Sequence, residues 1–157
     1  GSSAYGEEGD DIFIAYSGVC YGGIGNDTIT RYGGSGVSYG GEGDDVFNIY
    51  SSNAKYFGEE GNDTFNIIGS LSGIVIDGGS GTNNVTGEVG SNTTINVVGA
   101  NSGSVSLVSG EEQSVMINGI NYTVSTPSSA ATVIYRINDS GQISFSVNTG
   151  SVIIKGE

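Results

Sequence analysis

Several residue types are scarce or missing from this chain, and each absence removes a class of chemistry. The 157 residues contain no His, no Trp, one Pro and a single Cys, at Cys20. Without His, the chain cannot build a Ser-His or Cys-His nucleophile pair or a His-rich transition-metal site. One Cys makes no intrachain disulfide, so we expect Cys20 to be a small buried residue of a strand.

Long apolar runs and helical periodicity are also missing. No stretch of 18 apolar residues is present, which predicts that the chain does not insert into a membrane. The 29 Gly, together with many Ser, Thr, Asn, Val and Ile, instead favour turns and strands. The composition therefore predicts an all-β protein.

Positive charge is the third scarcity. The chain has 17 acidic and four basic residues, a formal net charge of -13. Residues 1–88 carry 13 of the acids against Arg31 and Lys55. Such a chain is not expected to bind nucleic acid or anionic lipid through charge, but its first half is suited to binding cations.

The first half contains a repeat, which is the most informative feature of the sequence. Four segments share one form, and a fifth keeps its shape with Asn83 in place of the Asp at the sixth position. The segments are Gly6–Phe13, Gly22–Ile29, Gly40–Phe47, Gly58–Phe65 and Gly78–Val85, and their starts are 16, 18, 18 and 20 residues apart.

Each repeat predicts one coil of loop, strand, turn and returning strand. Side chains of one kind recur at each coil, so we expect them to stack as ladders along the coils and to serve packing. The predicted ladders are Tyr5, Tyr21, Tyr39 and Phe57; Tyr16, Tyr32, Tyr50 and Ile68; and, in a thin core, Phe13, Ile29, Phe47, Phe65 and Val85. The predicted strands are Ile12–Ala15, Thr28–Arg31, Val46–Ile49 and Thr64–Ile67, returning as Val19–Tyr21, Val37–Tyr39, Lys55–Phe57 and Ile74–Ile76.

The repeated form Gly-Gly-x-Gly-x-Asp-x-apolar resembles the calcium-binding nonapeptide of the repeats-in-toxin (RTX, haemolysin-type) family over roughly residues 4–86. The resemblance implies a parallel β-roll or β-solenoid with Ca²⁺ bound between the loops of adjacent coils. Independently, Ca²⁺ requires six to eight oxygen ligands, and glycines allow a loop to curl so that carbonyls converge.

The resemblance also implies a set of metal ligands. The side-chain ligands would be Asp11, Asp27, Asp45 and Asp63. The carbonyl ligands would come from Glu7 and Gly9; Gly22, Gly23, Ile24 and Gly25; Gly40, Gly41, Glu42 and Gly43; and Gly58, Glu59, Glu60 and Gly61. Four intact loops would hold about three Ca²⁺ ions, with a weaker fourth site at Asn83.

Two departures from the family form carry expectations of their own. Glu7 and Glu59 replace the second glycine, which we expect to be tolerated only where φ is negative. The opposite turns lack the motif, as in Ser51–Asn53, so we expect ions along one side of the solenoid only. We interpret Asp10 and Asp44, beside the ligands, as solvated surface charges.

The sequence predicts three segments. Residues 1–3 are interpreted as a cloning remnant, residues 4–87 as the calcium-binding β-solenoid, and residues 88–157 as ion-free coils, Gly99–Val108 among them, with an antiparallel C-terminal β cap. Strands are predicted at Thr93–Val98, Ser104–Val108, Ser114–Ile117, Ile120–Val124, Thr132–Ile137, Gln142–Val147 and Ser151–Lys155, with hairpin turns at Asn138–Gly141 and Asn148–Gly150.

The function predicted from these features is a calcium-binding structural module, part of a larger secreted or surface-exposed bacterial protein, that folds and becomes rigid on export into Ca²⁺. An alternative is a carbohydrate- or surface-binding module of an adhesin or carbohydrate-active enzyme, with a polysaccharide or cell-surface ligand. An enzyme using paired carboxylates is not expected, because the acids fall on repeat-defined loop positions. Ice binding is not expected either, because loop positions three and five are irregular and acidic.

Overall fold

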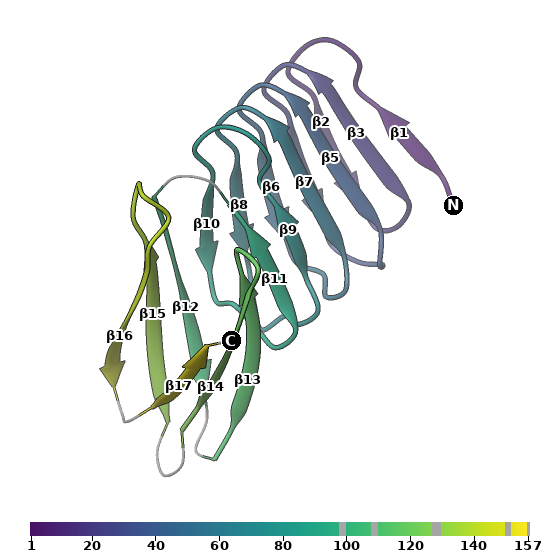
Figure 1. Cartoon of the computed structure of the whole chain (residues 1–157). Helices are drawn as coiled ribbons and strands as arrows, with labels where there is room; N and C mark the ends of the chain where they lie inside the picture. The colour runs from purple at the N-terminus through teal and green to yellow at the C-terminus, as the bar shows by residue number, and fades with distance from the viewer. Residues whose placement is uncertain (98–99, 108–109, 127–129, 150–151, 157) are drawn as a thin grey trace.

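The computed structural model describes residues 1–97, 100–107, 110–126, 130–149 and 152–156. In these residues the chain is all-β and winds into a β-solenoid of about six turns, closed at its C-terminal end by antiparallel strands (Figure 1). The expected all-β solenoid is thus confirmed. No helix in the described part is long and apolar enough to cross a membrane.

Two sheets form the walls of the solenoid. The first has nine strands in the order β1-β3-β5-β7-β9-β11-β13-β14-β17, and the second has five in the order β10-β8-β6-β4-β2. The strands of the first sheet are β1 Ser3–Tyr5, β3 Val19–Ile24, β5 Val37–Glu42, β7 Lys55–Glu60, β9 Val75–Asp77, β11 Thr93–Asn96, β13 Glu112–Ile117, β14 Ile120–Ser125 and β17 Ile153–Gly156. Those of the second are β2 Ile12–Ala15, β4 Thr28–Arg31, β6 Val46–Ile49, β8 Thr64–Ile67 and β10 Asn84–Gly87.

Like residues stack on like along the coils. Within the second sheet the parallel register places Phe13 beside Ile29, Ile29 beside Phe47 and Phe47 beside Phe65. Ile29, Phe47, Phe65 and Val85 are fully buried, while Phe13, in the first coil, is partly exposed. The predicted core ladder is therefore confirmed.

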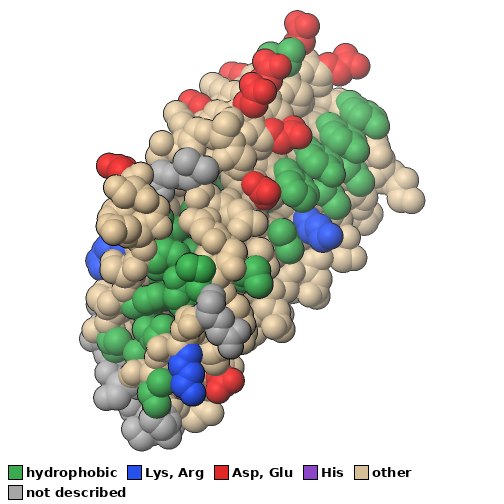
Figure 2. Space-filling view, viewed as in Figure 1, with side chains coloured by type: hydrophobic (Ala, Val, Ile, Leu, Met, Phe, Trp, Pro, Cys, Tyr) green, Lys and Arg blue, Asp and Glu red, His purple; other side chains and the backbone are tan. Residues whose placement is uncertain are grey.

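Both outer aromatic ladders are also present. Ring centroids are 4.9 Å apart for Tyr5 and Tyr21 and 5.0 Å apart for Tyr21 and Tyr39, with nearly parallel planes. On the other wall, Tyr16, Tyr32 and Tyr50 stack at 5.7 and 4.8 Å. Figure 2 shows an apolar stripe across the β1–β7 face and acidic side chains along the edge of the solenoid where the loops lie.

The first half departs from expectation in the length of the returning strands and in two backbone angles. β3, β5 and β7 continue through the first three loop residues, so Gly23 pairs with Gly41 within the sheet. The expectation of negative φ at Glu7 and Glu59 is wrong, since their φ values are 76° and 74°. The second loop position has φ near 108° in Gly23 and Gly41, and coil stacking imposes a left-handed backbone on the two glutamates as well.

A basic residue, Arg31, lies inside the core of the solenoid. Arg31 is completely buried in β4, in the core position that Ile49 occupies in the next coil. Its guanidinium donates to the Gly18 carbonyl (3.1 Å) and to the Ser38 hydroxyl (3.1 Å), and Nη1 has no partner. Burial raises the pKa of the nearby Cys20 thiol, against a smaller opposing effect of Arg31, and Cys20 is buried in β3 as expected.

The second half ends the solenoid. β11 still pairs in parallel with β9, and β13 with β11, but β14 and β17 add to this sheet as antiparallel strands. A separate three-stranded antiparallel sheet consists of β12 Asn101–Leu107, β15 Ala131–Ile137 and β16 Ile143–Thr149. The antiparallel cap is therefore confirmed.

The strand ends of the second half were predicted less closely. The turn at Asn138–Gly141 is confirmed by the hydrogen bond from Asn138 N to Gln142 O (3.0 Å). Asn148 and Thr149, predicted to form a turn, instead belong to β16. Val98, Gly99, Val108, Gly150 and Ser151, which belong to the predicted strands, coil and turn, lie outside the described residues.

Candidate metal centre

The sixth-position side chains of the repeats form a continuous column inside the loop edge of the solenoid. Asp27, Asp45 and Asp63 are each 1 % exposed, and Asn83 is fully buried. Each places Oδ1 as acceptor for the backbone N–H of the sixth-position residue one coil earlier. These bonds run from Asp11 N to Asp27 (2.8 Å), Asp27 N to Asp45 (2.7 Å), Asp45 N to Asp63 (2.9 Å) and Asp63 N to Asn83 (2.8 Å).

A second column of side chains runs beside the first. Asn26 N donates to Asp10 Oδ1, Asp44 N to Asn26 Oδ1, and Asn62 N to Asp44 Oδ1, each at 2.8 Å. These bonds point from a coil to the one before it, opposite to those of the sixth position. We call the two opposed bonds between neighbouring coils the Asx clamp. The interpretation of Asp10 and Asp44 as merely solvated charges was incomplete, because each accepts a hydrogen bond that joins two coils.

The clamp uses only one oxygen, Oδ1, of Asp27, Asp45 and Asp63. Oδ2 of Asp11, Asp27, Asp45 and Asp63 is buried and has no hydrogen-bond partner. A buried ionised oxygen without a partner is costly in a protein interior. Asn83 makes the same Oδ1 bond with a neutral amide, and its Nδ2 donates to the Ser80 carbonyl (3.2 Å). The hydrogen bond alone therefore does not account for the charge at Asp27, Asp45 and Asp63.

The inner carboxylates carry negative charge that no neighbouring cationic side chain among the described residues balances. Burial, together with a smaller effect of the neighbouring carboxylates and against the lowering effect of the backbone hydrogen bond, raises the pKa of Asp45 to about 7 and that of Asp63 to about 6. The pKa of Asp27 is raised by the same causes, burial first. Within the described residues no Lys or Arg forms an ion pair with these carboxylates. A bound cation would reverse these shifts by balancing the charge.

The first glycine of each loop allows the free carboxylate oxygen and a carbonyl oxygen to lie close to the backbone. A Cβ on Gly22 would collide with Asp27 Oδ2 and with the Gly40 carbonyl oxygen of the next coil. The same is true of Gly40, whose added Cβ would meet Asp45 Oδ2 and lie 2.9 Å from the Gly58 carbonyl oxygen. A carboxylate oxygen and a carbonyl oxygen of adjacent coils thus lie close together at each of these glycines. Both are hard oxygen ligands of the kind Ca²⁺ prefers.

The carbonyls predicted as ligands at the later loop positions are instead engaged in hydrogen bonds and packing contacts between coils. Those of Ile24, Glu42 and Glu60 accept N–H groups of Gly9, Gly25 and Gly43 at 2.8, 2.8 and 3.0 Å. The Glu7 carbonyl accepts from Ile24 N (2.6 Å) and the Glu59 carbonyl from Ser80 N (2.9 Å). The carbonyls of Gly9, Gly25 and Gly43 pack against the glycine α-carbons of the following coil. The Gly78 carbonyl, not predicted as a ligand, lies close to Gly58 and Asp63 Oδ2, as its equivalents do in earlier coils.

A three-carboxylate site is absent from the described residues, since no three His, Cys, Asp or Glu side chains are grouped around a possible ion. An ion in the column would have to combine one or two carboxylates with backbone carbonyls. Such a ligand set fits Ca²⁺ better than the softer transition metals.

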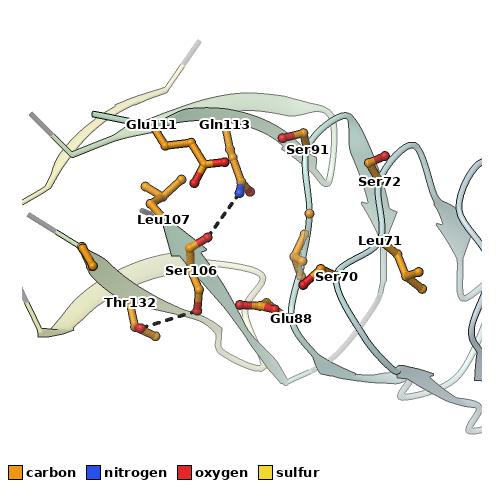
Figure 3. A pocket seen from close by; sticks show the side chains of 14 residues that line it. Ser70, Leu71, Ser72, Glu88, Ser91, Ser106, Leu107, Glu111, Gln113 and Thr132 are labelled. Atoms are coloured by element: carbon orange, nitrogen blue, oxygen red, sulfur yellow. Dashed lines mark hydrogen bonds between the residues drawn. The ribbon is translucent and has the colours of Figure 1, made fainter. Parts of the chain in front are cut away.

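A second candidate site lies where the solenoid meets its cap. A cavity of about 470 Å³ opens between the turns at Ser70–Ser72 and Glu88–Ser91 and the ends of β12, β13 and β15. Its floor is apolar, with Leu107 and Val89 buried, and its walls carry serine hydroxyls, Glu88 and Gln113 (Figure 3). Gln113 donates to the Ser106 carbonyl (3.2 Å), and its own buried Oε1 has no partner. No pattern in the sequence predicts this cavity, because its lining comes from five separate segments.

Comparison with protein-family models, with characterised proteins and with solved structures finds no match to this chain. The candidate sites are therefore interpreted from their own geometry and charge.

Proposed function

We propose that residues 4–87 form a calcium-binding structural module of a secreted or surface-exposed bacterial protein, related to the RTX repeat family. One observation carries the proposal: buried, unpartnered carboxylate oxygens recur in four successive coils, each close to the first loop glycine and to a carbonyl oxygen of the next coil. The inner column supplies Asp11, Asp27, Asp45 and Asp63 as ligands, which gives about three sites between four loops. The Asp63–Asn83 position has one carboxylate fewer and binds more weakly.

The module acts through the coupling of ion binding to folding. Without Ca²⁺ the carboxylate column repels itself and opposes stacking of the coils, so the chain is disordered or only marginally folded. Extracellular Ca²⁺ near millimolar concentration fills the sites, and the binding free energy then stabilises the fold. This behaviour suits a chain that is exported unfolded and becomes a rigid spacer outside the cell.

The test is a Ca²⁺ titration of EDTA-treated protein, followed by far-UV circular dichroism and by isothermal calorimetry. We expect a cooperative gain of β signal near millimolar Ca²⁺, a stoichiometry of about three, and no equivalent response to Mg²⁺. Asp139→Asn, in a cap turn remote from the loops, is the matched control for loop Asp→Asn variants. A protein that is fully folded in EDTA and takes up no Ca²⁺ would refute the proposal.

A second candidate function, binding of a polysaccharide or cell-surface ligand, is favoured by the junction cavity. Its size and hydroxyl-rich walls suit a sugar unit. The outward Tyr ladders support it less, because each inner ring is stacked on its neighbours and has no free face for a sugar ring. Screening polysaccharides in millimolar Ca²⁺ with the wild type and Gln113→Ala tests this candidate, and binding that Gln113→Ala leaves unchanged would rule out the cavity.

A further inference from the structure

The junction cavity lies where the two walls of the solenoid separate. β12 is joined to the preceding strand, β10, by the Glu88–Ser104 bridge and the hydrogen bond from Val89 N to Ser104 O (2.7 Å), and it then pairs with β15 of the cap. β13 instead stays with the first wall, in parallel with β11. The cavity opens between these diverging strands, so its lining comes from both the solenoid and the cap (Figure 3).

The charged side chains that line the junction cavity are all acidic. Glu88, directly after β10, and Glu111, directly before β13, are half-buried in its wall. The chain has four basic residues, all of them in the described part, and none lines this cavity. Its charge therefore favours a ligand with a positive group and repels a ligand carboxylate or sulfate.

The remaining lining combines an apolar patch with hydroxyl groups. Val89, Leu107 and Ala131 form the buried apolar part. The hydroxyl groups belong to Ser70, Ser72, Ser91, Ser106 and Thr132. A sugar ring has an apolar C–H face and a rim of hydroxyls, so it matches both parts, whereas a simple amine would match only the carboxylates. The volume of about 470 Å³ is within the range usual for small-molecule sites.

The solenoid side of the cavity is positioned by the last loops of the carboxylate column. The turn at Ser70–Ser72 follows β8, which begins directly after Asp63. The turn at Glu88–Ser91 follows β10, which begins directly after Asn83. Each turn thus lies at the far end of a strand whose near end carries a sixth-position side chain.

Backbone hydrogen bonds join these turns to each other and to the cap side of the cavity. Gly73 N donates to the Ser91 carbonyl (2.9 Å), and Asn92 N donates to the Ser114 carbonyl of β13 (2.9 Å). The wall therefore forms only when the coils that carry Asp63 and Asn83 are stacked on one another. A cavity built in this way is lost whenever the loops separate.

We propose that the junction cavity binds an amino sugar, a sugar unit with a protonated amine, and that this ligand and Ca²⁺ strengthen each other's binding. The ammonium group pairs with Glu88, while the ring packs on the apolar patch. The ligand class rests on the second candidate function, and the coupling rests on the proposed calcium-dependent folding. Because Ca²⁺ assembles the wall, a ligand that binds the assembled wall favours the calcium-loaded fold in return.

Isothermal calorimetry in millimolar Ca²⁺ tests the ligand class with three disaccharides, of glucosamine, of N-acetylglucosamine and of galacturonic acid. Short probes limit the general attraction of a polycation to the acidic loops. We expect the first to bind, the second to bind about tenfold more weakly or less, and the third not to bind. Equal binding of the first two overturns the ligand class. A protein that folds in Ca²⁺ but binds none of them overturns the proposal and leaves the calcium-binding function standing.

Matched glutamate variants place the ligand in the cavity. Glu88→Gln should weaken binding of the glucosamine disaccharide about tenfold. Glu112→Gln makes the same change at an exposed position of β13 outside the lining and should alter binding less than about twofold. An equal loss in both variants shows general attraction to an acidic chain and overturns the site. Ser70→Trp, at an exposed turn position, should block the cavity and abolish binding, with folding of every variant checked by circular dichroism in Ca²⁺.

Ca²⁺ titrations of the whole chain, with and without the glucosamine disaccharide, test the coupling. Ligand at one hundred times its dissociation constant favours the folded state about a hundredfold, and about three cooperatively bound ions share this gain, so the Ca²⁺ midpoint should fall about fivefold. An unchanged midpoint with ligand bound overturns the coupling alone. A chain that is folded in EDTA and binds the disaccharide equally there overturns the coupling and the calcium-dependent folding together.

Discussion

Replacing Asp45 by asparagine separates the two roles of its carboxylate. Oδ1 accepts the hydrogen bond from Asp27 N, and an asparagine can keep that bond as Asn83 keeps its equivalent. The charge and the unpartnered Oδ2 are lost. We therefore expect Asp45→Asn to stabilise the calcium-free protein and to destabilise the calcium-loaded protein, a change of sign that few other mechanisms produce.

The calcium-free effect follows from the raised pKa. A rise from 3.8 to about 7 is about three units, and each unit corresponds to about 1.4 kcal/mol. Solvent reaching the loop and relaxation of the neighbouring carboxylates screen much of this penalty. We expect Asp45→Asn to raise the free energy of unfolding in EDTA, near neutral pH, by about 1–2 kcal/mol.

The calcium-loaded effect is larger and opposite. Asp45 lies between Asp27 and Asp63 in the column, so it would contribute to two of the three sites. A site filled at one hundred times its dissociation constant stabilises the fold by about 2.7 kcal/mol. Losing two such sites would lower the free energy of unfolding by up to about 5 kcal/mol.

Urea unfolding followed by circular dichroism, in EDTA and in saturating Ca²⁺, measures both effects. Asp139→Asn, in the turn between β15 and β16, should change neither by more than about 0.5 kcal/mol. If Asp45→Asn shifts stability in the same direction under both conditions, the argument from an unbalanced buried charge is wrong.

Three further predictions follow from other features. In EDTA the free energy of unfolding should fall as pH rises from about 4 to 7. The pKa values of Asp27, Asp45 and Asp63 are raised in the folded state, so over this range the folded state holds protons that the unfolded state releases. Thermal melts across this range measure the change, and a rise in stability with pH would contradict the prediction. Gly40→Ala should lower the free energy of unfolding by about 1–3 kcal/mol and impair Ca²⁺ binding, because the added Cβ would collide with Asp45 Oδ2. Gly33→Ala is the matched control: its Cβ would be 3.5 Å from the nearest atom, so it should leave Ca²⁺ binding unchanged in the same calorimetric titration. The double variant Arg31→Met, Ser38→Ala replaces the buried guanidinium and one of its acceptors. It should leave the free energy of unfolding in urea unchanged or raise it by about 1 kcal/mol. Arg31→Ala alone should lower it by more than about 2 kcal/mol.

The repeat predicted the first half well because a solenoid repeats its local rules at every turn. Once Phe47 and Phe65 are recognised as equivalent, their stacking and burial follow, and the spacing of the loops fixes which strands pair. The four strands predicted after the loops match β2, β4, β6 and β8. The ladder of Tyr5, Tyr21 and Tyr39 follows from the same equivalence.

What the sequence did not predict depends on contacts between coils. The positive φ angles of Glu7 and Glu59 are imposed by the neighbouring coil, and glutamate as a residue type does not predict them. The opposed hydrogen bonds of Asp44 and Asp45 were missed because adjacent side chains with similar chemistry look interchangeable in a sequence. In the second half no repeat links the strands, so β16 was predicted two residues short at its C-terminal end.

The Asx clamp has a consequence for where the chain can change in length. Two bonds of opposite direction hold each pair of loops, so an insertion in a loop would break both and shift every side chain beyond it to the wrong face. The coil length nevertheless grows from 16 to 20 residues along the array, and the extra residues lie in the opposite turns, up to the longer turn at Gly69–Gly73. The solenoid thus has a loop edge of constant length and an opposite edge of variable length, so a foreign peptide grafted at Gly69–Gly73 would leave the loops undisturbed.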